Sequence, residues 1–212
     1  GSEIFRLSGH AGRVIAGAFS ADRKLIATGS DDKTIRLWDT ATGNFLRELA
    51  DHEIPADHEL SVRNLLFSKD SSRLYSCSSD GLARVWDVQT GQLAIRLEGH
   101  TQTIVSLALN ADETRLVTGS YDGKIKIWSA ASGRLLTTIT TPANDALQLV
   151  GFAPDGATLV SAALGGQLRR WQSMPLRAAD LPGTASMPEA ARYARYIAGL
   201  KPVAAPAADQ IN

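Results

Sequence analysis

The chain has 212 residues, of which 44% are hydrophobic and 21% charged, and its 22 basic and 22 acidic side chains leave no net charge. Because binding to a phosphate backbone requires an excess of lysine and arginine, this balance argues against nucleic acid as a partner. No apolar run approaches the ~20 residues of a membrane-spanning helix, and the single cysteine, Cys77, excludes an intramolecular disulfide framework. We therefore expect a cytoplasmic protein that binds neither nucleic acid nor membranes.

The first part of the chain reads as a series of short strands. A brief apolar run at residues 3–8 is followed by four more, at 14–19, 25–30, 34–38 and 45–49. Clusters of Gly, Asp, Ser and Asn separate the runs, which is typical of antiparallel strands joined by tight turns. The sequence therefore predicts one four-stranded sheet, preceded by a strand that belongs to a different sheet.

The same pattern recurs along the chain, with one tryptophan in each segment at Trp38, Trp86, Trp128 and Trp171. A four-stranded sheet of this size cannot bury its own faces, so successive sheets must stack on one another. Radial stacking of such sheets produces a β-propeller. We therefore expect an all-β propeller of four blades, the last lacking its outer strand. The predicted blades span residues of about 9–50, 51–98, 99–140 and 141–172.

Residues 173–212 differ from the repeats because they are rich in Ala and Pro. The sequence Ser-Met-Pro-Glu at 186–189 is a helix capping box, and apolar side chains recur at helical spacing after it. These features predict a short helix at about 187–200, which either docks on the propeller or binds a partner in a groove. We expect two regions, the repeats at 3–172 and this tail.

Residues 3–172 resemble the WD-repeat β-propeller family. Trp-Asp pairs close two segments at 38–39 and 86–87, and Gly-His pairs open two at 9–10 and 99–100. In that family a loop His, a strand Ser or Thr, a hairpin Asp and the Trp are linked by hydrogen bonds. The resemblance implies three such tetrads, all with gaps of 18, 4 and 6 residues. They are His10, Thr28, Asp32 and Trp38; His58, Ser76, Asp80 and Trp86; and His100, Thr118, Asp122 and Trp128. In the second segment the spacing selects His58 over His52.

The fourth segment departs from this pattern. Ser161 and Trp171 keep their places, but Ala143 stands where the His belongs and Gly165 where the Asp belongs. Since two of the four polar partners are missing, we expect this blade to lack the polar network and to depend on packing alone.

The predicted strands are offset by one from the blades. Residues 3–8 align with the outer strands of the blades, although they precede blade one, and no apolar run that could be an outer strand follows Trp171. In complete family members this offset closes the ring, since the first strand completes the last blade. Three arrangements stay open: the C-terminal part of a longer propeller, a ring shared with a second chain, and a closed ring of four blades. In the first two, blade faces that include Ile15, Ala18, Leu149 and Val150 lack a neighbour, so the chain would self-associate or pair with further blades.

The expected function is non-catalytic protein–protein interaction. In the family, one rim of the propeller binds partners, and the resemblance carries that rim onto nine residues here. They are Arg13, Ile15, Asp31, Ser61, Arg63, Ser79, Thr103, Val105 and Tyr121. We expect a protein or peptide partner, with a regulatory propeller attached to an enzyme encoded upstream of residue 1 as the alternative. Two Asp-His-Glu triplets, at 51–53 and 57–59, carry metal-binding side chains, but His58 is needed by its tetrad, so neither a metal nor another cofactor is expected.

Overall fold

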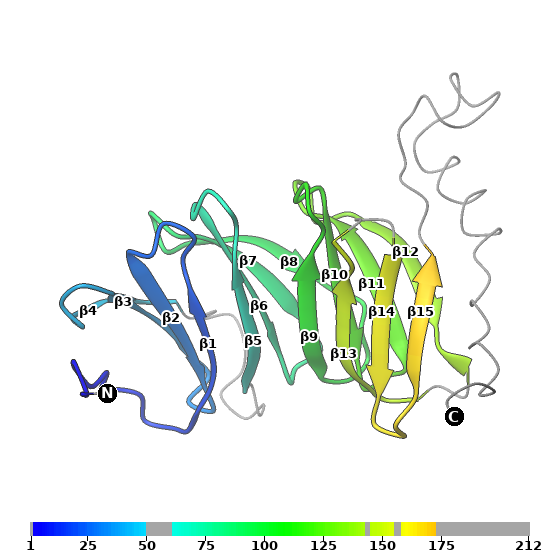
Figure 1. Ribbon diagram of the computed structural model, residues 1–212, viewed down its shortest axis with the longest axis horizontal. Helices are drawn as coiled ribbons and strands as arrows, with labels where there is room; N and C mark the ends of the chain where they lie inside the picture. Colours follow the sequence, from blue (N-terminus) through cyan, green and yellow to red (C-terminus); the bar gives the residue numbers. More distant parts are fainter. Residues whose placement is uncertain (1, 50–60, 143–144, 155–157, 173–212) are drawn as a thin grey trace, which may run out of the picture.

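The computed structural model describes residues 2–49, 61–142, 145–154 and 158–172. Within these ranges the chain forms four antiparallel sheets in sequence order, which stand side by side in an arc (Figure 1). The all-β architecture agrees with the sequence prediction. Among the described residues there is no helix with the length and apolar character needed to cross a membrane. The predicted C-terminal helix lies outside the described ranges.

Each of the first three blades has four strands, and the fourth blade has three in the described part of the chain. The runs predicted in the first segment are all strands, and only the third begins one residue later than expected. Blade one contains β1 (Val14–Phe19), β2 (Leu25–Ser30), β3 (Ile35–Asp39) and β4 (Phe45–Leu49). Blade two contains β5 (Val62–Phe67), β6 (Arg73–Ser78), β7 (Ala83–Asp87) and β8 (Leu93–Leu97). Blade three contains β9 (Ile104–Leu109), β10 (Arg115–Ser120), β11 (Lys124–Ser129) and β12 (Leu135–Thr140). Blade four contains β13 (Leu147–Phe152), β14 (Thr158–Ala163) and β15 (Leu168–Gln172).

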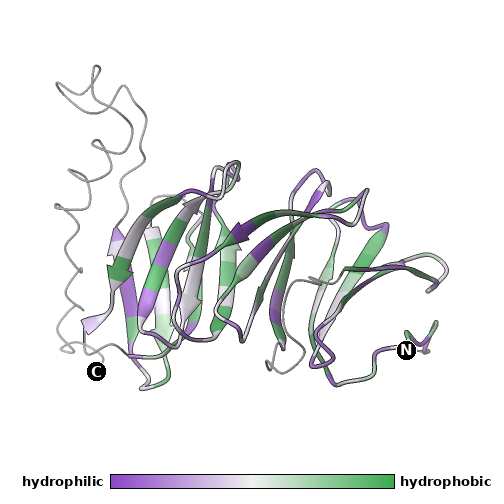
Figure 2. Cartoon of the chain, turned by 180° about the vertical axis from the view of Figure 1, so that it is seen from behind, coloured by the Kyte–Doolittle hydropathy of each residue, from purple (hydrophilic) through white to green (hydrophobic). Residues whose placement is uncertain are grey.

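The core consists of three apolar clusters, one between each pair of neighbouring blades. The hydrophobic residues are concentrated in the strands and the hydrophilic ones in the turns (Figure 2). In each cluster the later blade contributes its tryptophan: Trp86 packs between blades one and two, Trp128 between two and three, and Trp171 between three and four. Because no sheet buries both of its faces alone, the stacking of blades supplies most of the apolar burial.

The turn glycines explain how closely the blades approach one another. Gly133, between β11 and β12, has a φ of 71°, which side-chain-bearing residues rarely adopt. A Cβ added there would lie 2.3 Å from Cγ2 of Ile95, on the outer strand of blade two. The outer hairpins of blades two and three therefore rest against the outer strand of the blade before them, since Gly91 likewise approaches Leu49 of β4.

Two residues of the inner strands, Ala18 and Val150, were expected to lack a neighbouring blade, and the structure shows that both have one. Val150 is buried against blade three in the third cluster, and Ala18 packs against the cluster between blades one and two. Successive residues of a strand point to opposite faces, and a register shift between Leu147 and Leu149 sets which residue of β13 faces blade three. Leu149 is exposed, as expected for the end of the arc.

Residues 3–8 are not paired with any of the described strands, so their role as the outer strand of another blade stays a prediction. Their position is nevertheless that of one: a Cβ on Gly43 would lie 2.8 Å from Cγ of Phe5, so Phe5 packs on Gly43 as Ile95 packs on Gly133. The closed ring of four blades, one of the three arrangements that the sequence leaves open, is not formed, because blades one and four lie at opposite ends of the arc (Figure 1). A strand needs a hydrogen-bonded neighbour, and here residues 3–8 have none among the described strands.

Candidate binding rim and its polar supports

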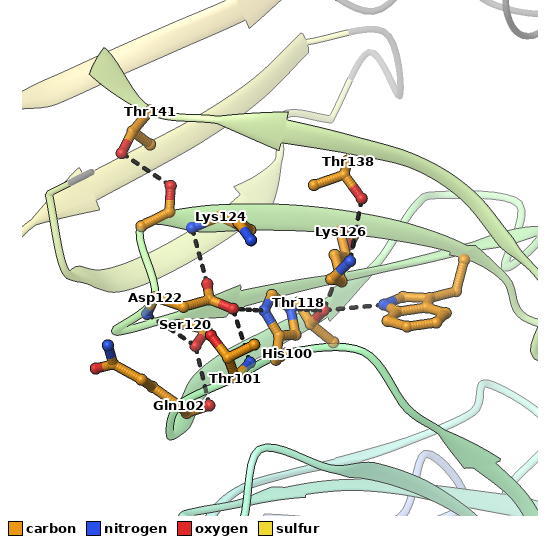
Figure 3. A network of polar contacts seen from close by, with 12 residues as sticks. His100, Thr101, Gln102, Thr118, Ser120, Asp122, Lys124, Lys126, Thr138 and Thr141 are labelled. Atoms are coloured by element: carbon orange, nitrogen blue, oxygen red, sulfur yellow. Dashed lines mark hydrogen bonds and ion pairs between the residues drawn. The ribbon is translucent and has the colours of Figure 1, made fainter. Parts of the chain in front are cut away.

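The tetrad of blade three forms one chain of hydrogen bonds between two strands and two loops (Figure 3). His100 precedes β9, and its Nδ1 lies 2.9 Å from Oδ2 of Asp122 in the β10–β11 turn. Its Nε2 lies 2.9 Å from Oγ1 of Thr118 on β10, and the indole N–H of Trp128 on β11 donates to the same Oγ1 at 2.9 Å. The set therefore fixes the loop before the blade to the blade's central strands.

The donors and acceptors of this chain specify the proton positions. An ionised carboxylate only accepts, so Nδ1 of His100 carries a proton and Nε2 accepts from the Thr118 hydroxyl. Burial lowers the pKa of His100 and outweighs the hydrogen bond to Asp122, which favours the neutral ring. Burial would raise the pKa of Asp122, but hydrogen bonds from the Thr101 N–H and from His100 hold it below its usual value. A neutral histidine and an ionised aspartate complete the network.

Blade one has the same arrangement. Nδ1 of His10 lies 2.8 Å from Oδ2 of Asp32, and its Nε2 lies 2.8 Å from Oγ1 of Thr28. The indole N–H of Trp38 donates to Oγ1 of Thr28 at 2.8 Å. Burial would raise the pKa of Asp32, but hydrogen bonds, that of Thr34 foremost, hold it far below its usual range. The structure thus brings together all four residues that the spacing selected.

Blade two is described without its histidine, since His58 lies outside the described residues. The indole N–H of Trp86 donates to Oγ of Ser76 at 2.8 Å, as in the other blades. Oδ2 of Asp80, the oxygen that faces a histidine in blades one and three, accepts from Arg84 at 2.6 Å. Arg84 also donates to Oγ of Ser78 at 3.1 Å and is itself buried. An arginine is therefore part of the polar set in this blade, which the tetrad pattern did not predict.

Blade four retains more polar contacts than expected, and the prediction that it depends on packing alone is wrong. The indole N–H of Trp171 donates to Oγ of Ser161 at 2.9 Å. Arg169 forms an ion pair with Asp145 at 2.7 Å, with both side chains largely buried. The carboxylate comes from the loop two residues before β13, not from the hairpin turn, so a search confined to the tetrad positions missed it.

The sequence signal behind these contacts is a cationic residue two places before every tryptophan, on the same face of the third strand. Arg36 pairs with Glu48 at 3.2 Å and lies over the Phe45 ring at 5.5 Å from its centroid. Lys126 donates to Oγ1 of Thr138 at 3.1 Å. The four cations are Arg36, Arg84, Lys126 and Arg169. Each of them has a partner in its own blade, which stabilises that blade, while the buried Nε of Arg36 and Nη1 of Arg169 have no hydrogen-bond partner among the described residues.

The predicted rim residues lie in pairs, each joining the loop before an inner strand to the turn between the second and third strands. The N–H of Asp31 donates to the carbonyl of Arg13 at 2.9 Å, and that of Tyr121 to the carbonyl of Thr103 at 3.0 Å. Blade two repeats the pairing through Ser79. These loops share one edge of the arc, the lower edge in Figure 1, where the β14–β15 turn also lies.

Side chains extend the rim from one blade to the next. Oγ of Ser61 in blade two donates to Oδ1 of Asp31 in blade one at 2.6 Å, and Arg13 pairs with the other oxygen of Asp31 at 3.3 Å. Oγ1 of Thr103 in blade three donates to the carbonyl of Ser79 in blade two at 3.4 Å. The rim of blades one to three is therefore one connected polar surface.

Three inner-strand residues lie beside this surface, namely Ile15, Arg63 and Val105, all half-buried. Arg63 differs from the other rim cation, Arg13, because its Nε is buried and has no hydrogen-bond partner. A buried donor without a partner is unfavourable and is best satisfied by an incoming acceptor. Tyr121, in the next blade, is half-buried and presents an aromatic ring at the same edge.

The Thr118–His100–Asp122 set resembles a nucleophile, base and orienting acid in connectivity, but its surroundings argue against catalysis. A nucleophile must reach its substrate. Thr118 is completely buried, and its hydroxyl oxygen already accepts the Trp128 N–H. Within the described residues no group of three or more His, Cys, Asp or Glu side chains is arranged to hold a metal. The Asp-His-Glu triplets lie outside those residues.

These features define a stack of propeller blades that carries a polar rim. The family description "WD domain, G-beta repeat" matches residues 1–39, 44–87 and 91–129, and the chain belongs to this family. It is 40% identical over 75 residues to human "Apoptotic protease-activating factor 1", covering 34% of this chain and 6% of that one. It is 25% identical over 103 residues to the Dictyostelium discoideum "U5 small nuclear ribonucleoprotein 40 kDa protein", covering 49% and 28%.

The chain thus spans less than a third of either relative. Among solved structures, it superposes on the computationally designed Ika4 protein with a TM-score of 0.69 and 31% identity. That superposition covers 82% of this chain and 99% of Ika4, so the four-blade arc corresponds to the whole of the design.

Proposed function

We propose that this chain is a non-catalytic scaffold that binds a protein or peptide on the rim formed by its inner-strand loops and central turns. The observation that carries the proposal is Arg63 at this rim, whose buried Nε has no hydrogen-bond partner among the described residues. WD-repeat relatives include a component of a ribonucleoprotein particle, and such an assembly role fits a surface without catalytic groups.

The chemistry of the rim indicates what the partner presents. Arg13 forms an ion pair with Asp31, whereas Arg63 offers a guanidinium that has no paired carboxylate among the described residues. A carboxylate or backbone carbonyl of the partner would satisfy it. Tyr121, in the next blade, supplies aromatic contact area at the same edge, and Arg and Tyr are the residue types that dominate the energetics of interfaces. A polar segment with an acidic or carbonyl anchor therefore fits this surface best.

The alternative, a regulatory propeller attached to an enzyme, differs in what the remainder of the protein does. The described residues hold no feature that favours it over a simple scaffold. The open ends of the arc, by contrast, favour association with further blades as well as with a rim partner.

The rim proposal can be tested with peptides selected from a display library against the whole chain. We expect Arg63→Ala and Tyr121→Ala each to weaken the selected peptide by about 1–2 kcal/mol, or roughly five- to thirtyfold in Kd. Arg134→Ala is the matched control, because this exposed arginine lies in the β11–β12 turn at the opposite edge. Fluorescence polarisation would measure the affinities, and circular dichroism would verify folding. Unchanged affinity in the double variant Arg63→Ala/Tyr121→Ala would reject the rim assignment.

A further inference from the structure

The blades meet through one repeated contact that has a direction. We call the side of a blade that holds its tryptophan the tryptophan face, and the opposite side the forward face. Between blades one and two, Phe67 and Trp86 on the tryptophan face of blade two share a cluster with Ala27 and Leu37 on the forward face of blade one. The next two interfaces repeat this polarity. A tryptophan face therefore packs on a forward face at every interface of the chain.

Among the described residues, each end of the arc leaves one kind of face without a neighbouring blade. On the tryptophan face of blade one, Phe19 pairs with Ile26 as Phe67 pairs with Leu74 in blade two. Phe19 is 65% exposed, whereas Phe67 is 6% exposed. The difference lies in the neighbour: Phe67 has a blade in front of it and Phe19 has none.

The forward face of blade four shows the same contrast. Leu168 begins the third strand of its blade, in the place that Ile35 and Ile125 hold in blades one and three. Leu168 is 73% exposed, against 2% for Ile35 and 0% for Ile125. Leu149, on the inner strand of the same blade, is also exposed. Exposed apolar side chains at positions that are otherwise buried mark a contact surface.

The backbone of residues 3–8 and the edge of β15 are also complementary, because each lacks a hydrogen-bonded neighbour among the described strands. Blade four has three described strands, and among them β15 is paired on one side only. Residues 3–8 have the position of an outer strand relative to blade one, since Phe5 packs on Gly43, but they have no strand to pair with. An unpaired edge and an unpaired strand can satisfy each other's backbone groups.

We propose that two copies of this chain associate head to tail, with the forward face of blade four of each copy packed on the tryptophan face of blade one of the other. Residues 3–8 of each copy add to β15 of its partner and complete blade four. A two-fold axis relates the copies, so the contact occurs twice and the two arcs close into one ring of eight blades. This association is independent of the rim function.

One residue makes the proposed contact weaker than the interfaces inside the chain. Arg170 lies on the forward face of blade four in the place of Leu37, Val85 and Ile127, which are all buried. Transfer of a guanidinium into an apolar interface opposes association. We therefore expect a reversible dimer, and Arg170→Leu should tighten it.

Sedimentation equilibrium of the full chain tests the proposal. The expected species has twice the chain mass of 22.6 kDa. Phe19→Asp alters the tryptophan face of blade one, and Leu168→Asp alters the forward face of blade four. Because each of the two contacts in the ring uses one face of each kind, either variant alone has a defect in both contacts. Each variant should therefore raise the dimer dissociation constant at least about tenfold. Mixing the two variants brings together one unaltered pair of faces and should restore association. Leu135→Asp is the control, because this exposed leucine lies on the outer strand of blade three, away from both ends.

Each alternative gives a different result. A wild-type monomer would overturn the proposal. Open polymers that grow with concentration would overturn the closed ring, and loss of association in Phe19→Asp but not in Leu168→Asp would overturn the head-to-tail polarity. The strand exchange has a separate test: Leu7→Pro, which disturbs the pairing of residues 3–8, should weaken the dimer while circular dichroism of the blades is unchanged. An unaffected dimer would exclude the exchange.

Discussion

The hydroxyl of Thr118 gives the sharpest test of how the blades are stabilised. Thr118→Val keeps the shape of the side chain and removes only the oxygen that both His100 and Trp128 contact at 2.9 Å. No cavity is created, so the change in stability reports hydrogen bonding. The His100 Nε2 and the Trp128 N–H would then be buried without partners.

The size of the effect follows from these two orphaned groups. A buried polar group that loses its partner costs about 1–3 kcal/mol. Two such groups orphaned by one substitution predict a loss of about 2–6 kcal/mol in the free energy of unfolding. Ser161→Ala in blade four is the comparison, because Oγ of Ser161 receives the Trp171 N–H and Ala143 stands at the histidine position. One orphaned donor predicts a loss of about 1–3 kcal/mol there.

Urea unfolding followed by far-ultraviolet circular dichroism would measure both losses. A double-mutant cycle adds Trp128→Phe, which removes the donor that Thr118→Val leaves without a partner. The double variant should lose less than the sum of the single losses, because one orphaned group is gone. A cost below about 0.5 kcal/mol for Thr118→Val, the level of an ordinary surface substitution, would refute the reasoning.

Three further predictions rest on single features. Because burial lowers the pKa of His100 in the folded state, the unfolded chain binds a proton at this histidine more readily than the folded chain does. The contribution of His100 to stability is therefore complete above the unfolded pKa of about 6.5 and is lost as the pH falls below it. His100→Gln should flatten this part of a curve of stability against pH. Burial raises the pKa of Cys77, so a thiol reagent should modify it only after unfolding, and rapid labelling of the native chain would contradict its burial. In Gly133→Ala the new side chain must adopt a positive φ and contacts Ile95, which should lower the free energy of unfolding by about 1–3 kcal/mol. Gly151→Ala is the control, because no atom lies within 4 Å of the new Cβ, and its stability should stay within about 1 kcal/mol of the native chain. Equal losses of stability in the two variants, measured by thermal unfolding, would contradict the packing argument.

The strands and the tetrads could be predicted because the signals that specify them are local or strictly spaced. Alternating side chains and turn residues define each strand within a few positions, and the gaps between His10, Thr28, Asp32 and Trp38 recur unchanged from blade one to blade three. The hydrogen bonds in blades one and three follow those gaps.

What could not be predicted depends on geometry that the spacing does not contain. The register shift in β13 turned Val150 toward blade three, and no residue pattern in that strand indicates it. The Arg169–Asp145 ion pair joins two residues outside the tetrad positions. The unpaired Nε of Arg63 depends on the three-dimensional surroundings of the side chain. The cation before each tryptophan was visible in the sequence at the repeat period, but its partner differs from blade to blade.

The indole hydrogen bond has a practical consequence for spectroscopy. All four tryptophans of the chain donate to a Ser or Thr hydroxyl, and each belongs to a different blade. The chain therefore contains one fluorophore per blade in nearly the same polar setting. Three of these rings lie in clusters between blades, whereas Trp38 belongs to none of these clusters and is buried within blade one, at 2% exposed. Emission from variants with a single tryptophan would report the order in which individual blades lose their structure.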